Sequence, residues 1–186
     1  MKTPMSRFHI HDDLTAPEAS LPILRGALAS AGQLPNLIGV LAGAPAVLRG
    51  YARFRSELRH GKLAPITLER IALAVAHLYG SEPGLALHRR TARQAGMTVD
   101  DVTLATEWDA LDERDALLLR WLRIVVAERS RPPAHLHEEV REAGWTEEHL
   151  LEAVAFASVE AFAAMVNVAG DVPADGSREL TRLHAA

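Results

Sequence analysis

The sequence contains no cysteine in its 186 residues. That absence excludes disulfide bonds, thiolate metal ligands and thiol redox chemistry. Lysine is nearly absent too, since Lys2 and Lys62 are the only two and arginine supplies almost all of the positive charge. The net charge of −4 argues against general nucleic-acid binding, which requires a concentrated basic surface.

Long uncharged apolar runs are also missing. The N-terminus reads MKTPMSRFHIHDD and lacks the apolar stretch that a secretory signal requires. The most apolar segment, residues 150–170, contains Glu152, Glu160 and Asn167, which favours a buried core helix over a membrane span. No glycine-rich phosphate loop and no serine-nucleophile elbow is present. We therefore predict a soluble, cytoplasmic protein that uses no cofactor.

The sequence does contain apolar residues at helical spacing along most of its length, and no segment has the pattern of a strand. The predicted fold class is all-α, with an N-terminal tail over residues 1–20, one helical domain over residues 21–173 and a C-terminal tail over residues 174–186. Thr67 is expected to cap a central helix, and Thr98 to start a short one. The other helices are expected near residues 21–31, 37–41, 46–59, 68–79, 81–96, 112–129, 134–143 and 146–168.

Two short segments of the chain resemble each other. Residues 95–102 read AGMTVDDV and residues 143–150 read AGWTEEHL. Each joins a short polar-faced helix to a capped helix, and each follows a longer apolar helix. This pattern fits an internal repeat of a helical unit. The alternative is that AGxT is a common join between two helices.

Glu69 and His88 are the candidate catalytic pair. Glu69 is in the first turn of the most apolar predicted helix, where the helix dipole alone favours a carboxylate. Gly80 lets the chain reverse, so this helix and the one carrying His88 are expected to be antiparallel. At about 1.5 Å per residue, the two side chains lie within about one helical turn of the same level. A contact, direct or through one water, is geometrically allowed and suits general acid–base chemistry.

Glu160 is an acidic residue within an apolar helix. Because an unpaired buried carboxylate is costly, we expect it to face a partner, water or a cavity, with arginine or histidine pairing favoured over catalysis. Two histidine pairs, His9 with His11 and His135 with His137, lack an identifiable third ligand. We interpret both pairs as solvated surface and expect no metal site.

Several segments together resemble the carboxymuconolactone decarboxylase / alkylhydroperoxidase D-like superfamily. The motifs that carry the resemblance are PNLIGVLAGAPAVLRGY at residues 35–51, GKL at 61–63, ERIALAVA at 69–76, His88, and AGMT at 95–98. A last segment, residues 162–172 with Asn167, is similar to the final segment of the peroxidase-related branch. The resemblance covers roughly residues 21–173. It implies an all-helical, alkylhydroperoxidase D-like domain that assembles into trimers or hexamers.

The same resemblance indicates an altered catalytic motif. Members of the peroxidase-related branch carry a glutamate, a CxxC pair at the start of the next helix, and a histidine four residues after the second cysteine. Glu69 and His88 match this pattern, whereas Ser81 and Gly84 occupy the cysteine positions. The chain therefore resembles a cysteine-less variant of that branch, without its thiol relay, because a serine hydroxyl is neither redox-active nor readily ionised. The segment LALHRR at 85–90 is similar to the decarboxylase branch, which typically has an acidic residue in place of Gly84.

Three functional hypotheses follow. The first is a cofactor-independent enzyme with lyase-like acid–base chemistry, in which Glu69 and His88 move protons on a small carboxylated or lactone-like substrate and Arg89 or Arg90 contacts an anion. The second is a non-catalytic oligomeric binding or scaffold protein of the same fold. The third, a peroxidase with peroxiredoxin-type activity, is what fold similarity alone suggests, and the absence of cysteine argues against it. The expected partners are a small-molecule ligand and copies of the same chain, with no nucleic acid and no membrane.

Overall fold

Every regular element in the computed structural model, which describes residues 6–176, is a helix. The predicted all-α fold is confirmed. The elements are the 3₁₀ helix η1 (Glu18–Ser20) and the α-helices α1 (Leu21–Ala31), α2 (Asn36–Leu41), α3 (Pro45–Arg59), α4 (Pro65–Leu78), α5 (Glu82–Gln94), α6 (Val99–Thr106), α7 (Glu113–Val126), α8 (Ala134–Glu142) and α9 (Glu147–Gly170).

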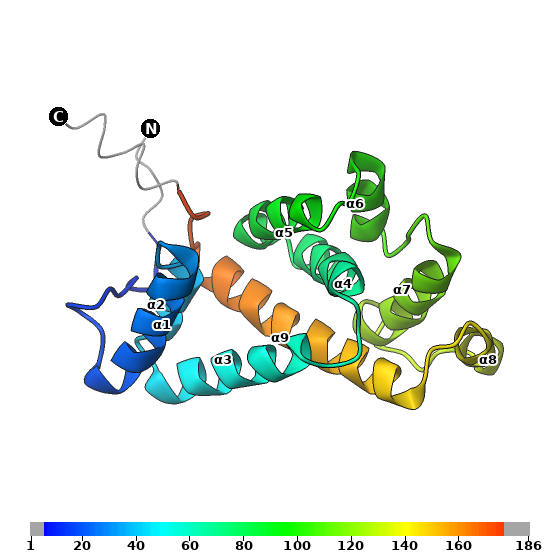
Figure 1. Cartoon of the computed structure of the whole chain (residues 1–186), viewed down its shortest axis with the longest axis horizontal. Coiled ribbons are helices and arrows are strands. Elements are labelled where there is room, and N and C mark those ends of the chain that lie inside the picture. The colour runs from blue at the N-terminus through cyan, green and yellow to red at the C-terminus, as the bar shows by residue number, and fades with distance from the viewer. Residues whose placement is uncertain (1–5, 177–186) are drawn as a thin grey trace.

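Helices α4 and α9 form the centre of the molecule. The long helix α9 runs through the middle, with α3 along one side and α4 and α5 on the other (Figure 1). Between Thr67 and Ala76, every residue of α4 except Glu69 is buried. Such an almost wholly apolar helix is stable only when other helices surround it. Glu69 is therefore the one position in this stretch of α4 where a carboxylate stays partly accessible.

Threonine caps give the two AGxT segments the same local structure. Thr98 at the start of α6 and Thr146 at the start of α9 each form a capping box with the residue three positions on. Gly96 and Gly144, which precede them by two residues, both have φ of +89°, a left-handed conformation that strongly favours glycine. The two joins thus share one geometry, while a repeat of whole helical units stays a prediction.

The start of α4 differs from the prediction. The helix begins at Pro65 rather than after Thr67, and its N-cap residue, Ala64, makes no side-chain capping bond. Proline at the first helical position is pre-organised for the helix and loses no hydrogen bond there, so a side-chain cap is not required. The Thr67 hydroxyl instead donates to the Asp115 carboxylate of α7, 3.0 Å away. Thr67 therefore ties α4 to α7 in the interior.

Helix α9 is long and apolar enough to cross a membrane by length and composition, and no other helix in the described residues 6–176 meets that test. However, 56% of its most apolar stretch is buried inside the protein. It also carries Glu160 in its buried face. These features are those of the core helix that the sequence predicts.

Segments from both predicted tails contact the helices. The backbone N–H of Arg7 donates to the carbonyl of Gly170 at 2.6 Å, and that of His11 donates to the carbonyl of Gly39 at 3.0 Å. Near the other end, the Asp175 carboxylate accepts from the backbone N–H of Asn36 at 2.8 Å. The remaining parts of the predicted tails, residues 1–5 and 177–186, lie outside the described residues. The boundaries proposed for the domain stay a prediction.

Candidate active site

Glu69 and His88 are in direct contact. Gly80, with φ of +64°, closes the turn between α4 and α5 and brings the two helices side by side. Nδ1 of His88 lies 2.9 Å from Oε2 of Glu69. The hydroxyl of Thr91, one turn further along α5, donates to the same oxygen at 2.6 Å. Glu69 is thus held by two side chains of the neighbouring helix.

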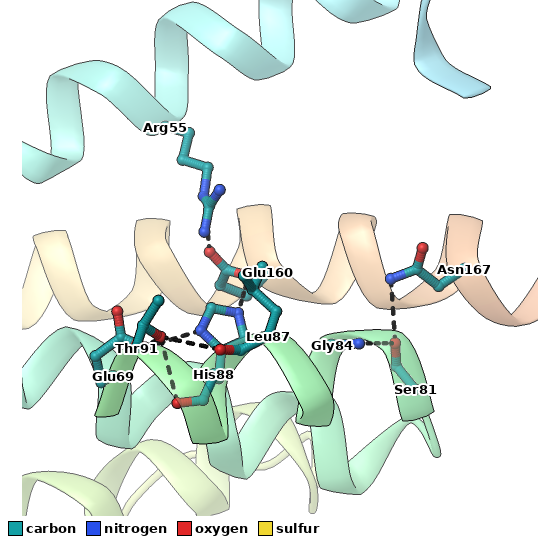
Figure 2. A network of polar contacts seen from close by, with 9 residues as sticks. All are labelled: Arg55, Glu69, Ser81, Gly84, Leu87, His88, Thr91, Glu160 and Asn167. Carbon is teal, nitrogen blue, oxygen red and sulfur yellow. Dashed lines mark hydrogen bonds and ion pairs between the residues drawn. The ribbon is translucent and has the colours of Figure 1, made fainter. Parts of the chain in front are cut away.

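The second ring nitrogen of His88 contacts Glu160, a residue of α9. Nε2 of His88 lies 3.2 Å from Oε2 of Glu160. The second oxygen of Glu160 accepts a hydrogen bond from Nε of Arg55 at 3.1 Å. Figure 2 shows the resulting chain of side chains, which runs across α3, α9, α5 and α4. Four ionisable groups from four helices therefore form one network, with His88 between two carboxylates.

Burial and pairing act against each other on the pKa values of the network. Burial alone lowers the pKa of His88, but its hydrogen bonds and charge interactions with Glu160 and Glu69 outweigh burial and raise it to about 9. Burial raises the pKa of Glu160, yet the cations Arg55 and His88 lower it to about 2. Burial also raises the pKa of Glu69, and the bonds from His88 and Thr91 bring it below its usual range. Burial lowers the pKa of Arg55, and Glu160 raises it well above its usual value.

At neutral pH these directions give a network of balanced charge. Glu69 and Glu160 are carboxylates, while His88 and Arg55 are cations. The imidazolium of His88 donates one N–H to each carboxylate, so each buried charge has an opposite charge within hydrogen-bond distance. Paired in this way, the charges are tolerated in the interior of the bundle.

A cavity of about 600 Å³ opens beside the network. Arg55, His88 and Glu160 line it, whereas Glu69 does not and lies on the opposite side of the His88 ring. The proton between His88 and Glu160 is therefore the one next to the cavity. Arg55 donates to Glu160 through Nε, which leaves its terminal nitrogens without a carboxylate partner among the described residues. A guanidinium in this position suits the binding of a ligand carboxylate.

Ser81 and Gly84 stand at the start of α5, where the resemblance places two cysteines. The hydroxyl oxygen of Ser81 accepts a hydrogen bond from the backbone N–H of Gly84 at 3.2 Å and so caps the helix. It also accepts from the amide nitrogen of Asn167 at 3.2 Å. No base contacts this hydroxyl among the described residues, so it is not set up as a nucleophile. Ser81 serves here as a helix cap and a hydrogen-bond acceptor.

Arg55 and Thr91 are the site residues that sequence reasoning missed. The arginines that it proposed for an anion contact, Arg89 and Arg90, are exposed, and of these two only Arg90 lines the cavity. A signal for Arg55 is present in the sequence, because it follows Leu48 and Tyr51 at helical spacing and so interrupts an apolar stripe with a charge. For Glu160, the expected partner is found twice over, in Arg55 and in His88.

No metal-binding cluster is evident in the part of the chain that the structure describes. No group of three or more His, Asp or Glu side chains there has an arrangement that could hold a metal ion. His9 and His11 lie close together, with ring centroids 4.4 Å apart, but they bring no third ligand.

Comparisons with known proteins show a family match over part of the chain and a shared fold. The sequence profile of the carboxymuconolactone decarboxylase family matches residues 45–127. A solved structure from Ralstonia eutropha JMP134, named an alkylhydroperoxidase AhpD core and an uncharacterized peroxidase-related protein, is similar with a TM-score of 0.80 and 18% identity, covering 94% of this chain and 95% of that chain. Residues 45–127 thus match the carboxymuconolactone decarboxylase family, and the chain has the fold of the alkylhydroperoxidase D-like structures.

Two further solved structures share this superfamily fold. An uncharacterized peroxidase-related protein from Silicibacter sp. TM1040 has a TM-score of 0.82 at 15% identity, covering 95% of this chain and 96% of that chain. The debrominase Bmp8 has a TM-score of 0.72 at 18% identity, with 97% of each chain covered. A cysteine-to-alanine variant of Bmp8 has been solved in complex with 2,3,4-tribromopyrrole. No curated protein matches the chain.

These likenesses establish the fold and a family match over residues 45–127, but not a reaction. At 15–18% identity the solved structures show the fold alone, so the branch to which the chain belongs stays a prediction. The decarboxylase profile over residues 45–127 includes Arg55, Glu69 and His88 but ends before Glu160.

Proposed function

We propose that this protein is a cofactor-independent acid–base enzyme that acts on a small carboxylated or lactone-like substrate in the cavity beside His88. One observation carries the proposal: His88 lies between two carboxylates at the cavity wall, which keeps its ring protonated at neutral pH. A buried imidazolium next to an accessible cavity is a general acid. Perturbed pKa values in a cavity also point to a functional site.

Decarboxylation is the lyase reaction that such an acid serves best. The bond from a carbon to its carboxylate breaks, CO₂ leaves, and the electron pair remains on the carbon or moves into an adjacent carbonyl as an enolate. The proton between His88 and Glu160 is then transferred to that carbon, which balances the reaction without a redox partner. Neutral His88, whose Nδ1–H stays bonded to Glu69, regains the proton at Nε2 from solvent in the cavity.

Arg55 is the group that would bind the substrate's negative charge. Its terminal nitrogens have no carboxylate partner among the described residues, and the guanidinium lines the cavity. A substrate carboxylate or developing enolate near Arg55 would take part of the positive charge that now stabilises Glu160. The proton shared by Glu160 and His88 would respond to this change, which links binding of the anion to proton transfer.

The test is CO₂ release from a panel of small carboxylated lactones and related acids, measured for the wild type and for Glu69→Gln and His88→Gln. Loss of a general acid lowers the rate by about 10² or more, so we expect both variants to fall by at least this factor on any substrate that the wild type turns over. Glu107→Gln and His135→Gln remove the same side-chain types from exposed positions and serve as matched controls. Wild-type turnover in both site variants would contradict the proposal.

The alternative is a non-catalytic oligomeric binding or scaffold protein of the same fold. Complete pairing of all four charged groups favours it, because a purely structural network would also pair them. In that case the Glu69→Gln and His88→Gln variants lose stability, and no acid in the panel is turned over by any form of the protein.

A thiol peroxidase remains disfavoured, because the chain has no cysteine to react with a hydroperoxide. We expect no peroxide reduction with a dithiol donor. Robust turnover in that assay would contradict this exclusion.

We further propose that the protein is cytoplasmic and assembles into a trimer or hexamer, binding neither nucleic acid nor membrane. Large apolar side chains on α9 support assembly, since Leu151, Met165 and Val168 are 65%, 48% and 51% exposed. Light scattering coupled to size-exclusion chromatography measures the mass. A monomer at micromolar concentration would contradict the assembly.

A further inference from the structure

Helices α5 and α9 contact each other through two polar pairs. His88 pairs with Glu160, and Ser81 pairs with Asn167 (Figure 2). All four residues line the cavity. The members of each helix are seven positions apart, which places them on the same helical face. At a rise of about 1.5 Å per residue, the two pairs lie roughly 10 Å apart along the helices.

Between the two pairs, small residues form part of the cavity wall. Gly84 of α5 and Ala163 and Ala164 of α9 line it. A Cβ added to Gly84 would come within 2.9 Å of the Ser81 hydroxyl oxygen, so even an alanine there would disturb the second pair. The wall thus leaves room for an extended ligand that reaches from one pair to the other.

The second pair contains an unused acceptor. Asn167 is only 6% exposed, and its amide nitrogen donates to Ser81. Its amide oxygen, Oδ1, is fully buried and has no hydrogen-bond partner among the described residues. Figure 2 shows this oxygen pointing away from Ser81. A buried acceptor without a partner is costly, and Asn167 lines the cavity, so a ligand that supplies the missing donor as the amide turns toward it would bind more tightly.

We propose that Asn167 is a second recognition point of the cavity and accepts a hydrogen bond from an O–H or N–H group at the far end of a carboxylated ligand. The carboxylate of that ligand contacts Arg55, and its middle part lies on the small residues between the two pairs. This assignment rests on the proposed function for the anionic end and adds the substrate class: an elongated acid with a hydrogen-bond donor at the end opposite its carboxylate. Ser81 acts as a positioning residue, because its hydroxyl holds the Asn167 amide.

The experiment compares three sets of linear acids of increasing length: ω-hydroxy carboxylates, ω-methoxy carboxylates and plain carboxylates. Affinity is measured by isothermal titration calorimetry on the full chain. At the best length, we expect the wild type to bind the hydroxy acid about tenfold more tightly than the methoxy acid, which is the effect of one hydrogen bond to a buried acceptor. Equal affinities, tighter binding of the methoxy acid, or no binding of any acid would overturn the proposal.

Two variants assign the effect to its residue. In Asn167→Ala the preference for the hydroxy acid should shrink to within about twofold, while the plain acid still binds. In Arg55→Met all the acids should weaken together, with the hydroxy-to-methoxy ratio unchanged. Retention of the ratio in Asn167→Ala would overturn the assignment to Asn167. If either variant fails to fold, the wild-type ratio alone still decides whether the cavity recognises a terminal donor.

The outcome is separable from that of the proposed function. A clear hydroxy-to-methoxy preference together with unchanged turnover in Glu69→Gln and His88→Gln would leave the recognition point and remove the acid–base mechanism. Turnover that depends on Glu69 and His88, without any preference for a terminal donor, would do the reverse.

Discussion

Nε2 of His88 lies 3.2 Å from Oε2 of Glu160, a residue 72 positions further along the chain. Since the opposite ring nitrogen contacts Glu69, both N–H groups of the imidazolium have an acceptor and the ring has one orientation. A histidine held in this way is a stable buried cation, and its properties depend on both carboxylates.

Replacing one carboxylate should therefore destabilise the fold. Glu160→Gln leaves Arg55 and His88 as neighbouring buried cations with only Glu69 to balance them. Removing one partner of a buried charge pair costs about 3 kcal/mol, and we expect urea denaturation to show a loss of that size. Glu148→Gln makes the same change at an exposed position of α9 and should cost less than about 1 kcal/mol. Equal effects of the two substitutions would mean that the network contributes no stability.

Stability should also depend on the protonation of His88. Its pKa rises from 6.5 to about 9 on folding, so the folded protein binds this proton more tightly than the unfolded chain does. The contribution is fully present below pH 6.5 and is lost as the pH rises through about 9. The free energy of unfolding, measured by urea denaturation across this range, should fall with increasing pH. In His88→Gln this part of the pH dependence should disappear. A wild-type stability that rises between these pH values would contradict the charge state assigned to His88.

Thr91 should support the site through Glu69. Thr91→Val keeps the side-chain shape but removes the hydroxyl that donates to Oε2 of Glu69 at 2.6 Å. We expect a stability loss of about 1–2 kcal/mol and an upward shift in the pKa of Glu69, followed by NMR of its carboxyl carbon. Thr103→Val is the matched control, because its exposed hydroxyl bonds only the carbonyl of Val99. An unshifted Glu69 resonance in the Thr91 variant would show that this hydroxyl does not tune the carboxylate.

Two cysteines placed at the start of α5 should form a disulfide. A Cβ on Gly84 would lie 3.4 Å from the Cβ of Ser81, close to the separation of about 3.8 Å found across disulfides. We expect the combined Ser81→Cys and Gly84→Cys variant to have no free thiol after mild oxidation, as measured by thiol titration and mass spectrometry. Each single variant should keep one free thiol. Two free thiols in the oxidised double variant would show that α5 cannot accept the bond.

Local sequence patterns were enough to predict the helices. Apolar spacing, glycine stops and threonine caps are short-range signals, and they placed most helix ends within a few residues. The contact between Glu69 and His88 could also be predicted from local patterns. One glycine turn joins their helices, and the helical rise sets the position of each side chain along its helix axis. The prediction that Thr67 caps α4 was wrong, because the helix begins two residues earlier at Pro65. A proline at the first helical position does not require a side-chain cap.

The rest of the network could not be predicted from local patterns. Arg55 and Glu160 are 105 positions apart, and their pairing depends on how α3 and α9 cross, which no local pattern encodes. In the sequence, each of these two residues is recognisable only as a charged position within an apolar stripe. A charged residue at a buried position indicates that it has a partner, but it does not identify that partner. The pairing of Ser81 with Asn167 has the same origin, because it depends on the alignment of α5 against α9.

Helix α9 supplies the second carboxylate of the network, Glu160, from a late part of the chain. Residues 45–127, which the family profile covers, hold two cations of the network, Arg55 and His88, and a single carboxylate, Glu69. These residues alone would therefore give the network a net positive charge, which Glu160 of α9 balances. Docking of the last long helix neutralises that charge and forms one wall of the cavity, so the site is completed in the same step as the fold.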